Sequence, residues 1–131
     1  MTMANEIMNS NTNSDYFCTL ATETKRDKMV IAKALNAATS LKDAGDKPFV
    51  IVGLMTTKGV RTQSGTECTN TYLIKEDGSA LFSQSDGIAR GAQWIRTIFT
   101  PDEIAEGLTV FVKPINLDGG RTLKTLDFVL D

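Results

Sequence analysis

The feature that most limits the fold is a series of short strand-like runs separated by turn signals. The run FVIVGLMT at residues 49–56 is continuously apolar, which is typical of a buried central strand, and Gly53 within it indicates a bulge or a close approach of another part of the chain. The run CTNTYLIK at 68–75 alternates polar and apolar residues. Asp77-Gly78 predicts a tight hairpin turn into a third strand at 80–83. These runs predict three consecutive antiparallel strands.

The third strand places two large apolar residues, Leu81 and Phe82, side by side. Neighbouring residues in a strand point to opposite faces, so only one of them can enter the core. The alternation alone does not choose between them.

Two helices are expected after the third strand. Ser85 or Asp86 can cap a helix over 88–99, which has an apolar side. The tetrad TPDE at 100–103 is a capping box with proline in the first turn, and it predicts a short second helix ending at Gly107. We assign the tryptophan of the first helix and four phenylalanines to the core: Trp94, Phe49, Phe99, Phe111 and Phe128.

Residues 108–117 and 122–130 alternate as two further strands around an Asp-Gly-Gly turn at 118–120. Five principal strands with a helix between the third and fourth are the pattern of the OB-fold, a five-stranded, partly open Greek-key barrel. The predicted class is therefore all-β with one or two short helices. Other small barrels share this strand count.

Residues 25–44 allow two interpretations. We interpret 28–35 as a strand and 36–48 as a loop, because the apolar residues there form no clear helical stripe. The alternative is a helix over 25–44, since Ala, Lys, Leu and Met favour helices. Residues 16–22 have a strand-type composition and predict a short strand or an extended approach to one.

The first residues differ from the remainder in composition. Residues 1–14 are rich in Asn, Ser, Thr and Met and predict a flexible arm, and 15–131 predict a single OB-type domain. The N-terminal sequence lacks the basic start and apolar stretch of a signal peptide, and no apolar run approaches the roughly 20 residues needed to span a bilayer. We expect a cytoplasmic protein with no membrane partner.

The chain contains no histidine, and its two cysteines, Cys18 and Cys68, are far apart in the sequence. Zinc sites built from Cys and His, and nucleophiles activated by His, are therefore excluded. No glycine-rich phosphate loop is present either. We expect no metal, cofactor, small-molecule substrate or catalytic residue. A small enzyme that uses carboxylates alone is a remaining alternative.

The formal charge is only −2, but the charges are unevenly distributed. Residues 25–75 contain nine Lys and Arg and four acids, whereas residues 76–131 contain five Lys and Arg and nine acids. Such a chain can present a positive face and still stay soluble. The alternative interpretation is that the asymmetry of charge arose by chance.

Several motifs resemble those of the single-stranded-DNA-binding proteins of small tailed phages that replicate by protein priming. LNAATSLKD at 35–43 is similar to the first loop of that family, and EDGSALFS at 76–83 is similar to its hairpin. A Val-Lys pair at 112–113 and Gly-Arg-Thr-Leu at 120–123 also fit. The similarity is spread over residues 28–130.

The resemblance implies an OB-fold that coats single strands during genome replication in the host cytoplasm. It also implies that Leu81 faces the interior while Phe82 stays outside as a ring on which a base can stack. The family stacks bases on tyrosines, and this chain departs from it with Phe82 in the hairpin and Met55 at a second expected aromatic position.

Binding single strands without sequence preference requires cations for the phosphates and ring faces for the bases. The predicted DNA-binding residues are six cations and two aromatic residues: Lys33, Lys42, Lys58, Arg61, Tyr72, Lys75, Phe82 and Arg121. Tyr72 is equally compatible with the rim of the core.

The sequence thus predicts a single-stranded-DNA-binding protein without catalytic activity, which can also self-associate along DNA. The alternative, from another class, is a protein-interaction or virion-associated small β-barrel that binds no nucleic acid.

Overall fold

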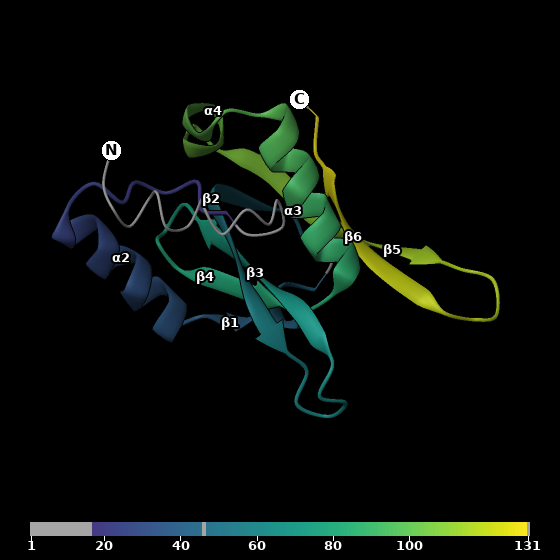
Figure 1. Ribbon diagram of the computed structural model, residues 1–131. Helices are drawn as coiled ribbons and strands as arrows, with labels where there is room; N and C mark the ends of the chain where they lie inside the picture. Colours follow the sequence, from purple (N-terminus) through teal and green to yellow (C-terminus); the bar gives the residue numbers. More distant parts are fainter. Residues whose placement is uncertain (1–16, 46, 131) are drawn as a thin grey trace.

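The computed structural model describes residues 17–45 and 47–130, and it is mostly β, with one curled sheet and a few short helices (Figure 1). The predicted arm at 1–14 lies outside the described residues. The elements in chain order are α2 (Lys25–Asn36), β1 (Thr39–Ser40), the 3-10 helix η1 (Leu41–Ala44), β2 (Phe49–Val60), β3 (Glu67–Lys75), β4 (Ala80–Ser83), α3 (Asp86–Ile98), α4 (Pro101–Ala105), β5 (Leu108–Asn116) and β6 (Thr122–Phe128).

The sheet has six strands in the order β1-β4-β3-β2-β5-β6, where five principal strands were predicted. The additional strand is β1, which has two residues and pairs in parallel with β4. The other neighbouring strands are antiparallel. β2, β3 and β4 follow one another through hairpins, and β5 returns by way of α3 and α4 to lie beside β2. This is the connectivity of a Greek key.

The three-stranded core of the sheet agrees with the sequence pattern. β2 pairs with β3 in the expected direction, and the register shifts between Ile51 and Gly53, which confirms a bulge there. The hairpin between β3 and β4 turns through Gly78, whose φ of 87° lies in the region that favours glycine. β2 continues to Val60, beyond the predicted end of the strand at residue 56.

The strand predicted at residues 28–35 is wrong, and the helical alternative is correct over α2. Thr24 and Asp27 form a reciprocal capping box at its start, and Ile31 and Ala34 are its buried residues. Met29 and Val30 are more than half exposed, so they broke the apolar stripe that would have signalled a helix. The Thr-x-x-Asp capping pattern was the overlooked signal.

Residues 17–20 approach the sheet in extended form, as one of the two predicted possibilities. Thr19 N donates to Leu54 O at 2.9 Å, and Thr56 N donates to Phe17 O at 2.8 Å. Phe17 is buried in the main core. This segment therefore satisfies backbone groups of β2 beyond the short stretch where β2 pairs with β5.

The main core fills the inside of the curled sheet beneath α3 and α4 (Figure 1). Its largest fully buried members come from both the sheet and the helices: Ile51, Leu54, Leu73, Ile88, Ile95, Ile104 and Val110. A second, smaller cluster lies on the opposite face, where Ala34 of α2 packs with Ile74 and Ala80. Both faces of β3 and β4 are therefore partly apolar, because one face belongs to the main core and the other packs against α2.

Two predicted core residues are not in the core. Trp94 is 60% exposed, because the buried side of α3 consists of Gly87, Ile88, Gly91, Ala92 and Ile95. Phe111 is half-buried and lies outside both core clusters, since Val110 and Val112 take the inward positions of β5. Phe49, Phe99 and Phe128 pack against the main core, as predicted.

α3 lies close against β6 because two glycines face that strand. A Cβ on Gly87 would overlap the carbonyl oxygen of Lys124, and a Cβ on Gly91 would lie 3.2 Å from Leu126 Cβ. The small side chains let the helix backbone approach the strand directly. This contact sets the position of the first turn of α3.

We predict that Gly87→Ala lowers the free energy of unfolding by about 1–3 kcal/mol, because the new methyl group meets a backbone atom that cannot rotate away. Gly91→Ala is the matched control. Its closer neighbours belong largely to a side chain, and alanine is favoured over glycine in a helix by about 1 kcal/mol. Urea unfolding followed by circular dichroism measures both. Equal stability of the two variants would contradict this account of the helix–strand contact.

Candidate functional site

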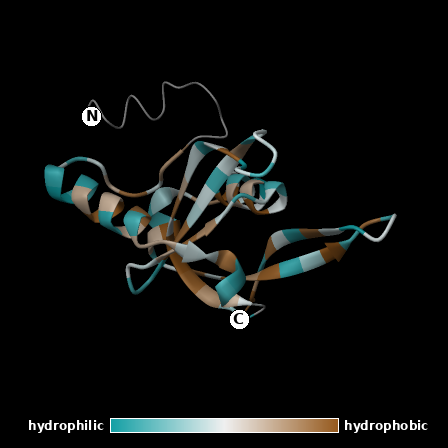
Figure 2. Ribbon diagram, turned by 90° about the horizontal axis from the view of Figure 1, so that it is seen from below, coloured by the Kyte–Doolittle hydropathy of each residue, from teal (hydrophilic) through white to brown (hydrophobic). Residues whose placement is uncertain are grey.

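The sheet is curled but its edge strands leave a cleft of about 560 Å³. On one side of the cleft are β1, η1 and the end of β4, and on the other is the β5–β6 hairpin. This hairpin projects from the body of the structure (Figures 1 and 2). Leu41, Ile88 and Val112 of the main core contribute to its lining. The polar and aromatic part of the lining includes Lys42, Arg61, Phe82, Ser83, Gln84 and Lys124.

The alternation of β4 places its two apolar neighbours, Leu81 and Phe82, on opposite faces of the sheet. Leu81 is 4% exposed and belongs to the main core, which confirms that it faces the interior. Phe82 is half-buried on the other face, pairs with Tyr72 across the strands, and lines the cleft. The ring centroids of Tyr72 and Phe82 are 5.2 Å apart at an interplanar angle of 44°. Tyr72 therefore supports the ring of Phe82 from the side.

Three cations line the cleft from three separate parts of the chain. Lys42 comes from η1, Arg61 from the residue after β2, and Lys124 from β6. Neither lysine makes an ion pair with any residue that the structure describes. Among the described residues of the lining none is acidic. The cleft is therefore a positively charged site, and Phe82 belongs to its lining.

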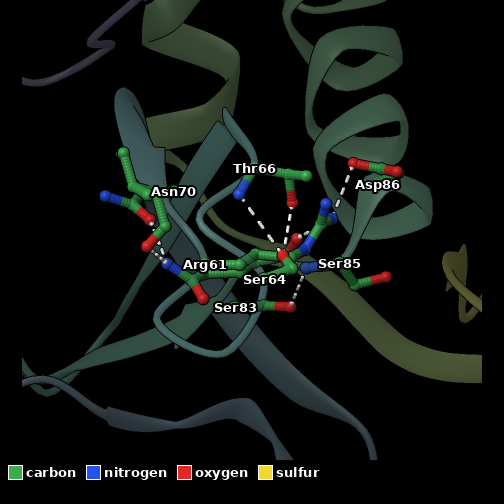
Figure 3. Close-up of polar contacts among 9 residues, drawn as sticks. Arg61, Ser64, Thr66, Asn70, Ser83, Ser85 and Asp86 are labelled. Atoms are coloured by element: carbon green, nitrogen blue, oxygen red, sulfur yellow. Dashed lines mark hydrogen bonds and ion pairs between the residues drawn. The ribbon is translucent and has the colours of Figure 1, made fainter. Parts of the chain in front are cut away.

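Arg61 is held in place at the start of α3 (Figure 3). Its Nη2 donates to Gln84 O at 3.0 Å and to Asp86 Oδ1 at 3.1 Å. Gln84 Nε2 in turn donates to Asn70 Oδ1 at 3.0 Å, which ties the linker between β4 and α3 to β3. These contacts fix the wall of the cleft next to Phe82.

The linker itself has one further internal contact. Ser85 N donates to Ser83 Oγ at 3.0 Å. Ser85 is the N-cap of α3, as one of the two predicted possibilities, but its side chain makes no capping hydrogen bond.

Of the eight residues predicted for the site, the structure brings Lys42, Arg61 and Phe82 together in the cleft and places Tyr72 beside Phe82. The other four cations do not line it: Lys33, Lys58, Lys75 and Arg121. Lys33 lines a separate shallow surface with Lys25, Arg26, Met29 and Val30 of α2. Lys58 pairs with Glu67 at 3.0 Å, and Arg121 is exposed after the turn between β5 and β6.

The sequence interpretation missed Lys124. This residue pairs with Pro114 across the β5–β6 hairpin, and both line the cleft. Lys124 is two residues before the buried Leu126 and so lies on the inward face of β6. That periodicity was visible in the sequence. The sequence could not show that Lys124 lines a cleft, because only the tertiary structure shows that the inward face of β6 meets a cleft at this position and not the core.

The position at which the resemblance implies a second stacking residue holds Met55, and it is not exposed. Met55 lies in one cross-strand row with Tyr72 and Phe82, but it is only 8% exposed. Its backbone forms an isolated antiparallel β-bridge with Cys18. Burial raises the pKa of the Cys18 thiol. Cys68 is buried as well.

No helix in the described part of the chain is both long and apolar enough to cross a membrane. Comparison of the chain with known protein families, curated proteins and solved structures gave no match. What the cleft can bind is therefore inferred from its own chemistry.

We predict that Leu81→Ala and Phe82→Ala differ strongly in stability although the residues are neighbours. Leu81→Ala opens a cavity in the main core and should cost about 2–5 kcal/mol. Phe82→Ala removes a half-buried ring next to Tyr72 and should cost less than about 2 kcal/mol. Urea unfolding of both variants measures the difference. A larger loss for Phe82→Ala would show that Phe82, not Leu81, supports the core.

Proposed function

We propose that the protein binds single-stranded DNA without sequence preference and coats it during phage genome replication in the host cytoplasm, with no catalytic step. The observation that carries the proposal is the cleft, in which Phe82 lies together with Lys42, Arg61 and Lys124 and no described lining residue is acidic. These are the two kinds of group that single-strand binding requires.

The chemistry of the cleft also favours non-specific binding. Every base has a face that can stack on the ring of Phe82, and stacking contributes roughly 1–3 kcal/mol per base. The lysine ammonium groups bind phosphates as point charges and do not read base edges. A cleft of about 560 Å³ can hold a base with its phosphate.

The strand connectivity supports an OB-fold as the framework for this function. In this proposal β2, β3, β4, β5 and β6 are taken in order as the five strands of that fold, with the helices α3 and α4 between the third and fourth. OB-folds bind oligonucleotides on the face of strands 2 and 3 and with the loops between strands 1 and 2 and between strands 4 and 5. In this chain those strands are β3 and β4. Arg61 begins the first of these loops, and Lys124 lies just after the second.

The resemblance of LNAATSLKD and EDGSALFS to the phage single-strand-binding family is consistent with this framework. The first motif ends in β1 and η1, where Lys42 lies, and the second contains β4, where Phe82 lies. Two separate motifs of the resemblance therefore contribute Lys42 and Phe82 to the lining of the same cleft.

A protein-interaction barrel is the alternative function, and one observation favours it. Trp94 and Ile98, one helical turn apart on α3, are 60% and 61% exposed, and tryptophan is enriched among residues that dominate protein interfaces. Neither residue lines the cleft. Binding of DNA at low salt therefore separates the two functions.

We predict that the protein binds fluorescently labelled oligo-dT and that its affinity falls steeply with salt, because cations of the cleft displace counterions from the phosphates. Lys124→Gln and Lys42→Gln should each reduce the slope of log K against log salt by about 0.7. Fluorescence anisotropy measures the binding. Lys33→Gln makes the same change of charge outside the cleft and should leave the slope unchanged. If the wild type does not bind oligo-dT at low salt, the proposed function is wrong.

We also predict that Phe82→Ala weakens oligo-dT binding by roughly 1–3 kcal/mol while leaving the salt slope unchanged, because a stacking surface is lost but no charge. Phe82→Tyr should bind about as well as the wild type, since the ring face is retained. The same anisotropy titration measures both. A loss of affinity in Phe82→Tyr equal to that in Phe82→Ala would argue against stacking.

A further inference from the structure

The cation nearest the start of α3 already has an anionic partner within the protein. Arg61 Nη2 lies 3.1 Å from Asp86 Oδ1 (Figure 3). The partner carboxylate belongs to the first turn of α3. Among the described residues, it is the only acidic group that forms an ion pair with a cation of the cleft. Lys42 and Lys124 have no such partner among the described residues.

The pair is accessible to solvent and to a ligand. The Arg61 side chain is 36% exposed and the Asp86 side chain is 72% exposed. Only Nη2 of the guanidinium makes hydrogen bonds to described side chains or carbonyls, so its remaining N–H groups can reach a phosphate. Exposed ion pairs of this type are weak, and a second anion can compete for the cation.

We propose that Asp86 is an internal competitor of DNA phosphate for Arg61 and thereby limits the affinity of the cleft for single strands. The carboxylate neutralises the guanidinium before DNA arrives, and it repels a phosphate that binds at the same nitrogen. Arg61 is held through Gln84 O in addition, so its position does not depend on the carboxylate alone. The inference rests on the proposed function and adds to it the residue that sets how tightly the strand is held.

The salt dependence of binding distinguishes this role from a purely structural one. A phosphate that displaces Asp86 from Nη2 of Arg61 in the wild type leaves the carboxylate unpaired, so a cation is taken up while counterions leave the DNA. In Asp86→Asn the amide keeps a hydrogen-bond acceptor at the same place but has no charge. The net release of counterions is then larger. A residue that only supported the helix would weaken binding when changed and would not steepen its salt dependence.

The test compares oligo-dT binding by the wild type and Asp86→Asn over a range of salt concentrations, using fluorescence anisotropy. We expect Asp86→Asn to bind up to about fivefold more tightly at low salt, which corresponds to the strength of an exposed ion pair. We expect its slope of log K against log salt to be steeper by about 0.7. The two affinities should converge at high salt.

Asp127→Asn is the matched control. It also removes one negative charge and frees a cation, since Asp127 lies 3.4 Å from Lys113 Nζ. Lys113 lies between two cleft residues of β5, Val112 and Pro114, and so points to the opposite face. This variant should bind with the wild-type salt slope.

A second comparison ties the effect to Arg61. In the Arg61→Gln background, adding Asp86→Asn should give no gain in affinity, because the competed cation is gone. A wild type that binds oligo-dT together with an Asp86→Asn variant that binds no more tightly would overturn this inference alone. A gain that persists without Arg61, or that Asp127→Asn reproduces, would overturn it too. Absence of binding by every variant would overturn the proposed function and this inference with it.

Discussion

The close contact between α3 and β6 is the interaction on which the rest of the structure depends. Gly87 and Gly91 allow the helix to lie directly on the strand, so that Ile88, Ala92 and Ile95 fill the inside of the curled sheet. The same contact fixes the first turn of α3, and with it Asp86 and the linker that holds Arg61. The cleft lies where this first turn, β4 and the β5–β6 hairpin meet. Core and candidate site therefore share one packing contact.

At the candidate site, the inward faces of β5 and β6 extend beyond the hydrophobic core. Val112 is buried, whereas Pro114, two residues further along β5, is exposed and lines the cleft. Lys124 stands in the same relation to Leu126 on β6. A hairpin longer than the core it covers thus exposes its inward residues to solvent. Together with Phe82 from the opposite edge, these residues form a cationic surface with an apolar floor.

Much of the β framework could be predicted, because strand pairing here is local in sequence. The bulge at Gly53, the turn at Gly78 and the capping box at Thr100 all follow from single residues with specific backbone or side-chain properties. α2 could not be predicted from its apolar pattern, because Met29 and Val30 are exposed and only two of its residues are buried. Trp94 was predicted to be in the core but is exposed, since the buried side of α3 is formed by glycines, an alanine and two isoleucines.

The sequence by itself determined the order of the five principal strands and their turns, the uneven charge and the rule that either Leu81 or Phe82 must leave the core. These depend on neighbours along the chain and on the period of two in a strand. Only the tertiary structure decided that Leu81 is inside, that Lys124 joins Lys42 and Arg61, and that Lys58 is paired with Glu67 instead. The reason is physical: a charge acts through the distance to its partners in space, and the curl of the sheet sets that distance.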